Sequence, residues 1–123
     1  MVYSKLEQEV WWMLRSVEDF YFIQQYPIDL GRKRLYLDFY LPYNKIAIEC
    51  QGIQHFKPRD FFGGIEKFRK TIMYDKMKYD YCKANGIELI YIGGSRCKKY
   101  CKLTDVEQLR NILCMKILGY IPY

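Results

Sequence analysis

The sequence predicts a single α/β domain, residues 1–123, in which a mixed sheet of about four strands is flanked by helices. Residues 34–41 and 45–51 alternate between two sets of side chains with the two-residue period of a strand. A helical pattern over residues 65–84 is followed by Asn85-Gly86 and a short apolar run, which is half of an α/β crossover. The chain is long enough for one core and too short for two.

The first helix is expected to begin at Ser4, because Ser4 and Glu7 have capping-box spacing. Its expected buried stripe consists of Leu6, Val10, Met13, Leu14 and Val17. Residues 20–28 are aromatic and β-branched enough for a strand, which Pro27 is expected to end. A turn over residues 29–33 then leads to the two central strands.

The central strands are joined by Pro42-Tyr43-Asn44. Proline ends the first strand, and asparagine tolerates the left-handed backbone of a tight turn. If Tyr43-Asn44 is a two-residue loop, Leu41 faces Ile46, and Asp38 falls opposite Glu49. Side chains opposite one another on a sheet face have Cβ atoms about 5 Å apart, and two carboxylates at that distance repel each other.

Such a pair either keeps a proton or holds a cation. A divalent cation with oxygen ligands would suit it, so Asp38 and Glu49 form a candidate metal site; two exposed surface acids are the alternative. Glu7, His55 and Asp75 are expected near the same edge of the sheet. Their ordinary alternatives are a helix cap, a structural histidine and a salt bridge to lysine, respectively.

The remaining elements are a long helix, a strand over residues 88–92 and a final helix that Thr104 and Glu107 open as a second capping box. The expected apolar stripe of the long helix is Ile65, Phe68, Ile72, Tyr79 and Cys82. The expected inward residues of the final helix are Val106, Leu109, Ile112, Leu113 and Ile117.

The chain is basic, with a formal charge of +6 and a pI of about 9.0, and it contains 13 tyrosines. This composition is compatible with a polyanionic partner, of which nucleic acid is the commonest. The candidate DNA contacts are Arg32, Lys33, Arg34, Lys57, Arg59, Lys70 and Lys78. A solvated charged loop is the ordinary alternative for residues 32–34.

The five cysteines have irregular spacing, and Cys97 and Cys101 lack a second ligand pair, so neither a zinc site nor disulfides are expected. No run approaches the ~18 apolar residues of a membrane span, and no signal peptide is evident. We therefore expect a protein of a reducing compartment without a membrane partner. The expected location is the cytoplasm of a prokaryotic cell, whether the gene belongs to that cell or to a phage.

The order of these features resembles the PD-(D/E)XK nuclease superfamily, and within it the very short patch repair (Vsr-like) and small phage or homing endonucleases. SKLEQEVWWML resembles their first helix, and LDFYLP resembles the strand with the metal aspartate. QGIQHF resembles their strand end with its glycine and histidine. TIMYDKMKYDYCKANGIELIYI resembles their long helix, glycine turn and next strand. The resemblance covers roughly residues 4–92 and implies a restriction-endonuclease-like core of order α-β-β-β-α-β-α.

The resemblance implies a DNA endonuclease that depends on Mg²⁺, with Mn²⁺ able to substitute, and that nicks or cuts both strands with a metal-activated water. It implies that Asp38, Glu49 and the backbone carbonyl of Cys50 hold the metal. His55 would orient or deprotonate the water.

Glu7 and Asp75 are implied as outer ligands or as groups that orient His55. Gln51, also a catalytic candidate, stands where the superfamily more often has lysine, so the positive charge must come from elsewhere; the candidates are Lys57, Lys70 and Lys78. The Vsr-like branch does not normally rely on a carboxylate at the position of Glu49, so features of both branches are combined. The zinc ligands of mismatch-repair members are not evident, which argues against mismatch recognition.

Two other functions stay open: a catalytically inactive nucleic-acid-binding module of the same fold, and a structural interaction protein. RNA or a DNA–RNA hybrid is also an open substrate. A domain of this size has little surface with which to recognise a long DNA sequence. A homodimer or a partner subunit could therefore supply specificity.

Overall fold

The computed structural model describes residues 3–52, 64–94 and 97–122. Within these ranges seven elements follow one another in the predicted order: α1 (Lys5–Ser16), β1 (Ile23–Asp29), β2 (Arg34–Leu41), β3 (Ile46–Gln51), α2 (Gly64–Ala84), β4 (Glu88–Gly93) and α3 (Val106–Ile117). The fold class is α/β, as predicted.

The four strands form one sheet in the order β1-β2-β3-β4. The first three are antiparallel, and β4 is parallel to β3, as a crossover through α2 requires. Gly86 ends α2 with a φ of 68°, the left-handed conformation expected there. Leu41 faces Ile46 as predicted, but the left-handed residue of the connecting turn is Lys45 (φ 52°) rather than Asn44.

The sequence suggested that Pro27 ends the first strand, but it does not. It lies within β1 and faces Tyr36 of β2. Because β1 is an edge strand, a residue without an amide hydrogen is tolerated there. The strand also begins later than expected, at Ile23.

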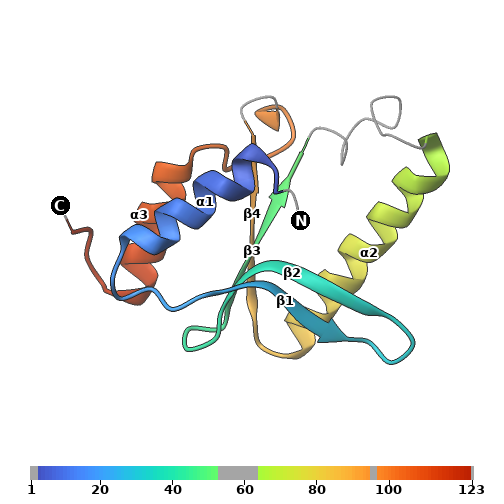
Figure 1. Cartoon of the computed structure of the whole chain (residues 1–123), viewed down its shortest axis with the longest axis horizontal. Coiled ribbons are helices and arrows are strands. Elements are labelled where there is room, and N and C mark those ends of the chain that lie inside the picture. The colour runs from blue at the N-terminus through green and yellow to red at the C-terminus, as the bar shows by residue number, and fades with distance from the viewer. Residues whose placement is uncertain (1–2, 53–63, 95–96, 123) are drawn as a thin grey trace.

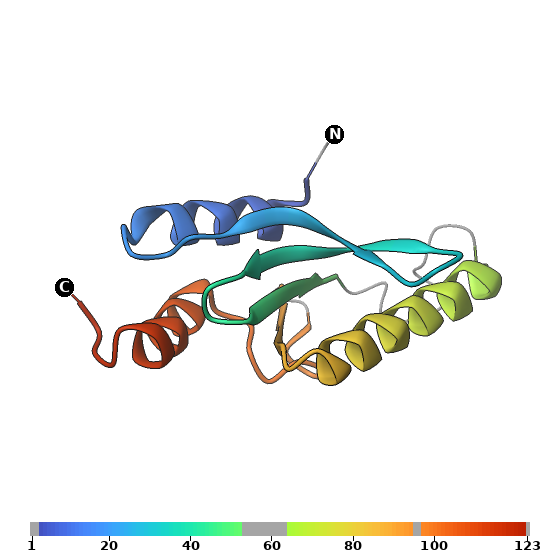
Figure 2. The same cartoon turned by 90° about the horizontal axis from the view of Figure 1, so that it is seen from below.

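The sheet lies between α1 and α3 on one face and α2 on the other (Figures 1 and 2). The core cluster on the first face includes Val10, Leu14, Phe39, Ile48 and Leu113. The cluster under α2 includes Ile28, Leu37, Tyr40, Ala47 and Cys82. Each large side chain buried in this way contributes about 1.5–3 kcal/mol. Across the described ranges, no helix has the length and apolar character to cross a membrane.

The expected apolar stripe of α2 is largely wrong. Ile65, Ile72 and Tyr79 are about half exposed, while Phe68 is half-buried and Cys82 is buried. The side chains that pack on the sheet instead are Tyr74, Met77 and Tyr81. The N-terminal half of α2 extends away from the strands (Figure 1), so apolar residues there meet little of the sheet.

Two details of α3 also differ from expectation. Its N-cap is Asp105, whose side chain accepts a hydrogen bond from the Glu107 amide, rather than Thr104. Ile112 is partly exposed, and Cys114 takes a place in the core. The other four expected residues, Val106, Leu109, Leu113 and Ile117, do pack in or against the core.

Candidate active site

Asp38 and Glu49 lie where β2 and β3 stop pairing. The last paired residues are Phe39 and Ile48. Beyond them, the Asp38 backbone N–H donates to Glu49 Oε2 (3.0 Å), and the Cys50 backbone N–H donates to Asp38 Oδ2 (2.8 Å). Each carboxylate thus satisfies an amide of the opposite strand. The two acids are neighbours, as the predicted register requires.

Lys78 of α2 brings a positive charge into contact with this pair. Its Nζ lies 2.8 Å from Glu49 Oε1, and the two side chains are only 18% and 7% exposed. Burial first, and then the charge of Asp38, raise the pKa of Glu49 to about 8, against the opposing effect of Lys78. Burial lowers the pKa of Lys78, but Glu49 and Asp38 outweigh it and the net shift is upward. Lys78 therefore favours the ionised form of Glu49, while burial and the charge of Asp38 oppose it.

Glu7, Gln51 and Asp75 complete the site. They line a cavity of about 190 Å³ together with Asp38, Glu49, Cys50 and Lys78. The helix cap brings Glu7 to this point, since the Ser4 side chain accepts from the Glu7 amide (3.1 Å). Burial and the charge of Asp38 raise the pKa of Glu7. The half-buried Asp75 lies on the inward side of α2, as expected.

Gln25 is a site residue that the sequence did not reveal. Its Nε2 lies 3.5 Å from both Glu7 Oε2 and Asp38 Oδ1, so one amide connects two of the acids. The backbone of Gln25 is left-handed, with a φ of 54°, which is uncommon for a residue with a side chain. A strand pattern carries no signal for such a residue.

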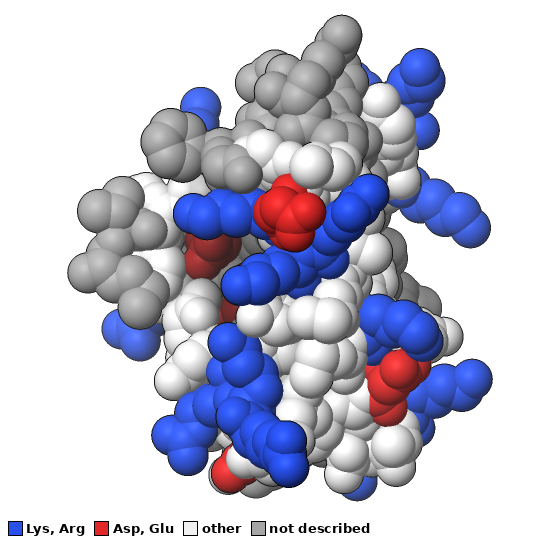
Figure 3. Space-filling view, turned by 90° about the vertical axis from the view of Figure 1, so that its right-hand side faces the viewer, with Lys and Arg blue, Asp and Glu red and all other residues white. Residues whose placement is uncertain are grey.

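The cavity is acidic, although the chain is basic overall. Four carboxyl groups and one ammonium line it. On the face that carries α2, Lys and Arg side chains cover much of the surface, and some acidic groups lie set back between them (Figure 3). The clustered carboxylates favour the binding of a small cation, and the basic surface around them attracts an anionic partner.

The available ligands fit magnesium better than a metal ion that takes all its ligands from protein side chains. Among the residues that the structure describes, no three Asp, Glu, Cys or His side chains group closely enough to hold a metal. Magnesium, however, is commonly bound by one or two carboxylates, with waters and substrate phosphates supplying the other ligands. Asp38 and Glu49 match that requirement.

The remaining predicted residues divide into two groups. His55, Lys57 and Arg59 lie outside the described residues. The others lie away from the cavity: Arg32, Lys33 and Arg34 are exposed in and after the β1–β2 turn, and Lys70 is exposed on α2. The Lys33 ammonium lies 4.8 Å from the centre of the Tyr74 ring, so it connects the turn to α2.

No family model matches this sequence, and no curated protein or solved structure is significantly similar to it. Its function must therefore be argued from the cavity and its surroundings.

The repulsion between the acids yields a stability prediction. Asp38→Asn keeps an oxygen that can accept from the Cys50 amide but removes the charge that helps to raise the pKa of Glu49. In EDTA, we expect the melting temperature to rise by about 4 °C, equivalent to about 1 kcal/mol. The control is Asp80→Asn, which removes an exposed carboxylate paired with Lys76 and should change stability by less than about 1 kcal/mol. A less stable Asp38→Asn would contradict the account.

Proposed function

We propose that this chain is a metal-dependent DNA endonuclease with a restriction-endonuclease-like fold. The observation that supports the proposal most strongly is the arrangement of Asp38 and Glu49 on separating strands, with Lys78 2.8 Å from Glu49. Two carboxylates and a lysine are suited to phosphodiester hydrolysis, in which a metal and a cation must offset negative charge on the phosphate. The order of the elements agrees with this fold.

Asp38 and Glu49 would hold Mg²⁺ or Mn²⁺, and the backbone carbonyl of Cys50 is the third ligand that the resemblance implies. When bound, the metal would supply an activated water and stabilise charge on the phosphate. Gln25 would keep Asp38 in place, since its amide bonds to both Asp38 and Glu7. His55 stays the candidate for orienting or deprotonating the water.

Gln51 stands where the superfamily more often has a lysine. We propose that Lys78 takes over the role of that lysine. Of the three lysines considered from the sequence, Lys70 is exposed on α2, Lys57 is outside the described residues, and Lys78 lines the acidic cavity. Its ammonium lies against Glu49, next to where a scissile phosphate would bind. We propose that it stabilises the negative charge that develops on that phosphate.

DNA is the substrate that the resemblance implies, and the exposed basic residues of α2 suit its phosphate backbone. The exposed cationic residues of α2 include Lys67, Arg69, Lys70, Lys76 and Lys83. Such residues bind a phosphate backbone without reading its sequence. Specificity would then come from a second copy of the chain or from a partner subunit.

An inactive DNA-binding module is the second candidate. Two observations favour it: no three metal-ligating side chains group together among the described residues, and the Lys78 ammonium already contacts Glu49 Oε1. Such a module would bind DNA through the same basic surface and would be insensitive to metal.

Plasmid cleavage separates the two candidates. We expect wild-type protein to nick or linearise supercoiled DNA in Mg²⁺ or Mn²⁺ but not in EDTA, and Asp38→Ala to be inactive because the central metal ligand is gone. Agarose electrophoresis measures the products, and fluorescence anisotropy measures binding. If supercoiled, linear, branched and gapped DNA all stay intact in Mg²⁺ and in Mn²⁺, while DNA binding is unchanged by Asp38→Ala, the chain is the inactive module instead.

The role of Lys78 is tested by moving the charge. We expect Lys78→Met to slow single-turnover cleavage by about 10²-fold, the usual loss on removing one transition-state contact. Adding Gln51→Lys should restore part of the rate, because position 51 lines the same cavity. Lys116→Met, which removes a lysine of α3 that pairs with Glu88 away from the cavity, is the control. A full rate in Lys78→Met would assign the role to another cation.

A further inference from the structure

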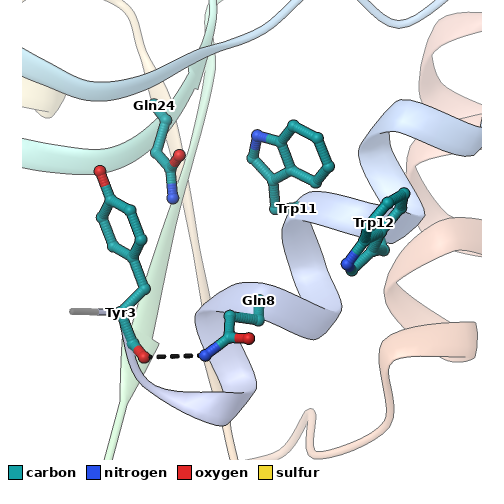
Figure 4. Close-up of a pocket in the computed structure, with 5 residues that line it drawn as sticks. All are labelled: Tyr3, Gln8, Trp11, Trp12 and Gln24. Atoms are coloured by element: carbon teal, nitrogen blue, oxygen red, sulfur yellow. Dashed lines mark hydrogen bonds between the residues drawn. The ribbon is translucent and has the colours of Figure 1, made fainter. Parts of the chain in front are cut away.

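A second cavity, of about 300 Å³, lies between α1 and the edge strand β1. It is lined by Tyr3, Gln8, Trp11, Trp12 and Gln24, which we call the aromatic pocket (Figure 4). Trp12 is 66% exposed, although large aromatic side chains gain most from burial. An exposed indole at the edge of a concave surface is available to a ligand.

The aromatic pocket is held in shape by contacts behind it. The rings of Trp11 and Trp12 are nearly perpendicular, at 89° with centroids 5.0 Å apart, and therefore form a corner. Trp11 also packs edge-on against Phe22, and the Arg15 guanidinium lies 5.5 Å from the centre of its ring. Gln8 Nε2 donates to the Tyr3 carbonyl oxygen at 3.0 Å, which fixes the N-terminal side. A preformed pocket binds a flat ligand at a smaller entropic cost.

Two pairs of consecutive residues connect this pocket to the acidic cavity. Glu7 lines the acidic cavity, and the next residue, Gln8, lines the aromatic pocket. Gln24 lines the aromatic pocket, and the next residue, Gln25, bonds to Glu7 and Asp38. The same short stretches of α1 and β1 therefore serve both sites.

We propose that the aromatic pocket receives one unstacked nucleobase of the strand whose phosphate enters the acidic cavity. This inference rests on the proposed function. Aromatic faces stack on any base, and the side-chain amides of Gln8 and Gln24 can donate to and accept from a base edge. Figure 4 shows the Gln24 amide directed into the pocket from β1, on the side opposite the indoles of α1.

The preferred substrate would then carry an unpaired base near the cut, as in a gap, a flap or a single strand. A base within a continuous duplex must first be unstacked and unpaired, which costs a few kcal/mol. The aromatic pocket would accordingly select for substrate structure, while the basic residues of α2 bind any phosphate backbone.

Fluorescence of 2-aminopurine tests this inference without any cleavage. The base analogue is placed at an unpaired position of a gapped oligonucleotide, and binding is measured in EDTA. We expect wild-type protein to change the fluorescence, because stacking on an indole alters the emission of the base. Trp12→Ala should weaken binding about tenfold, the effect of losing one stacked base, and Trp12→Phe should retain most of the affinity.

Tyr43→Ala is the matched control, because Tyr43 is 83% exposed and does not line the pocket; it should bind like the wild type. On a continuous duplex, Trp12→Ala should lose much less affinity than on the gapped DNA. Gln24→Ala gives a second test that leaves the indoles in place, and it should weaken binding of the gapped DNA.

Equal binding of gapped DNA by wild type, Trp12→Ala and Gln24→Ala would overturn the inference and would leave the pocket to another occupant, such as an apolar side chain of a partner protein. An equal loss on duplex and gapped DNA would also overturn it. Metal-dependent plasmid cleavage without a fluorescence change would keep the nuclease and remove the base pocket. A Trp12-dependent fluorescence change without cleavage would keep the pocket and remove the nuclease.

Discussion

Two buried acids held against each other's backbone are the constraint on which the site depends. Where β2 and β3 part, the amides of Asp38 and Cys50 would lack partners, and the carboxylates of Glu49 and Asp38 accept their hydrogen bonds. Hydrogen bonds from backbone amides to carboxylates are among the stronger ones in proteins. They hold the two carboxyl groups close to each other, although this proximity opposes the ionisation of both, which a freely rotating pair of side chains would avoid.

The fold supplies what this arrangement needs. The parallel pairing of β3 with β4 requires a crossover, and the crossover helix α2 brings Lys78 and Asp75 to the acids. Tyr74, Met77 and Tyr81 hold that helix on the sheet. Burial raises the pKa of Glu49 to about 8 even with Lys78 beside it, so the metal-free site is electrostatically unfavourable. Functional sites often carry such a cost in stability.

The sequence was sufficient where a regular period determined the outcome. Alternation indicated the two strands, a tight turn at Tyr43-Asn44 placed Leu41 opposite Ile46, and the position of the two acids followed from that register. Where no period applies, the sequence was insufficient. Gln25 reaches the acids from a left-handed backbone conformation that alternation does not encode. Lys78 could not be chosen over Lys70, because the buried face of α2 depends on how much of the helix contacts the sheet.

The binding of a divalent cation in the acidic cavity can be measured by a titration with Mn²⁺ followed by electron paramagnetic resonance. We expect wild-type protein to remove free Mn²⁺ from solution, Asp38→Asn to do so far more weakly, and Asp80→Asn, changed at an exposed acid of α2, to behave like the wild type. Identical Mn²⁺ binding by all three proteins, or none by any of them with DNA present, would contradict this expectation.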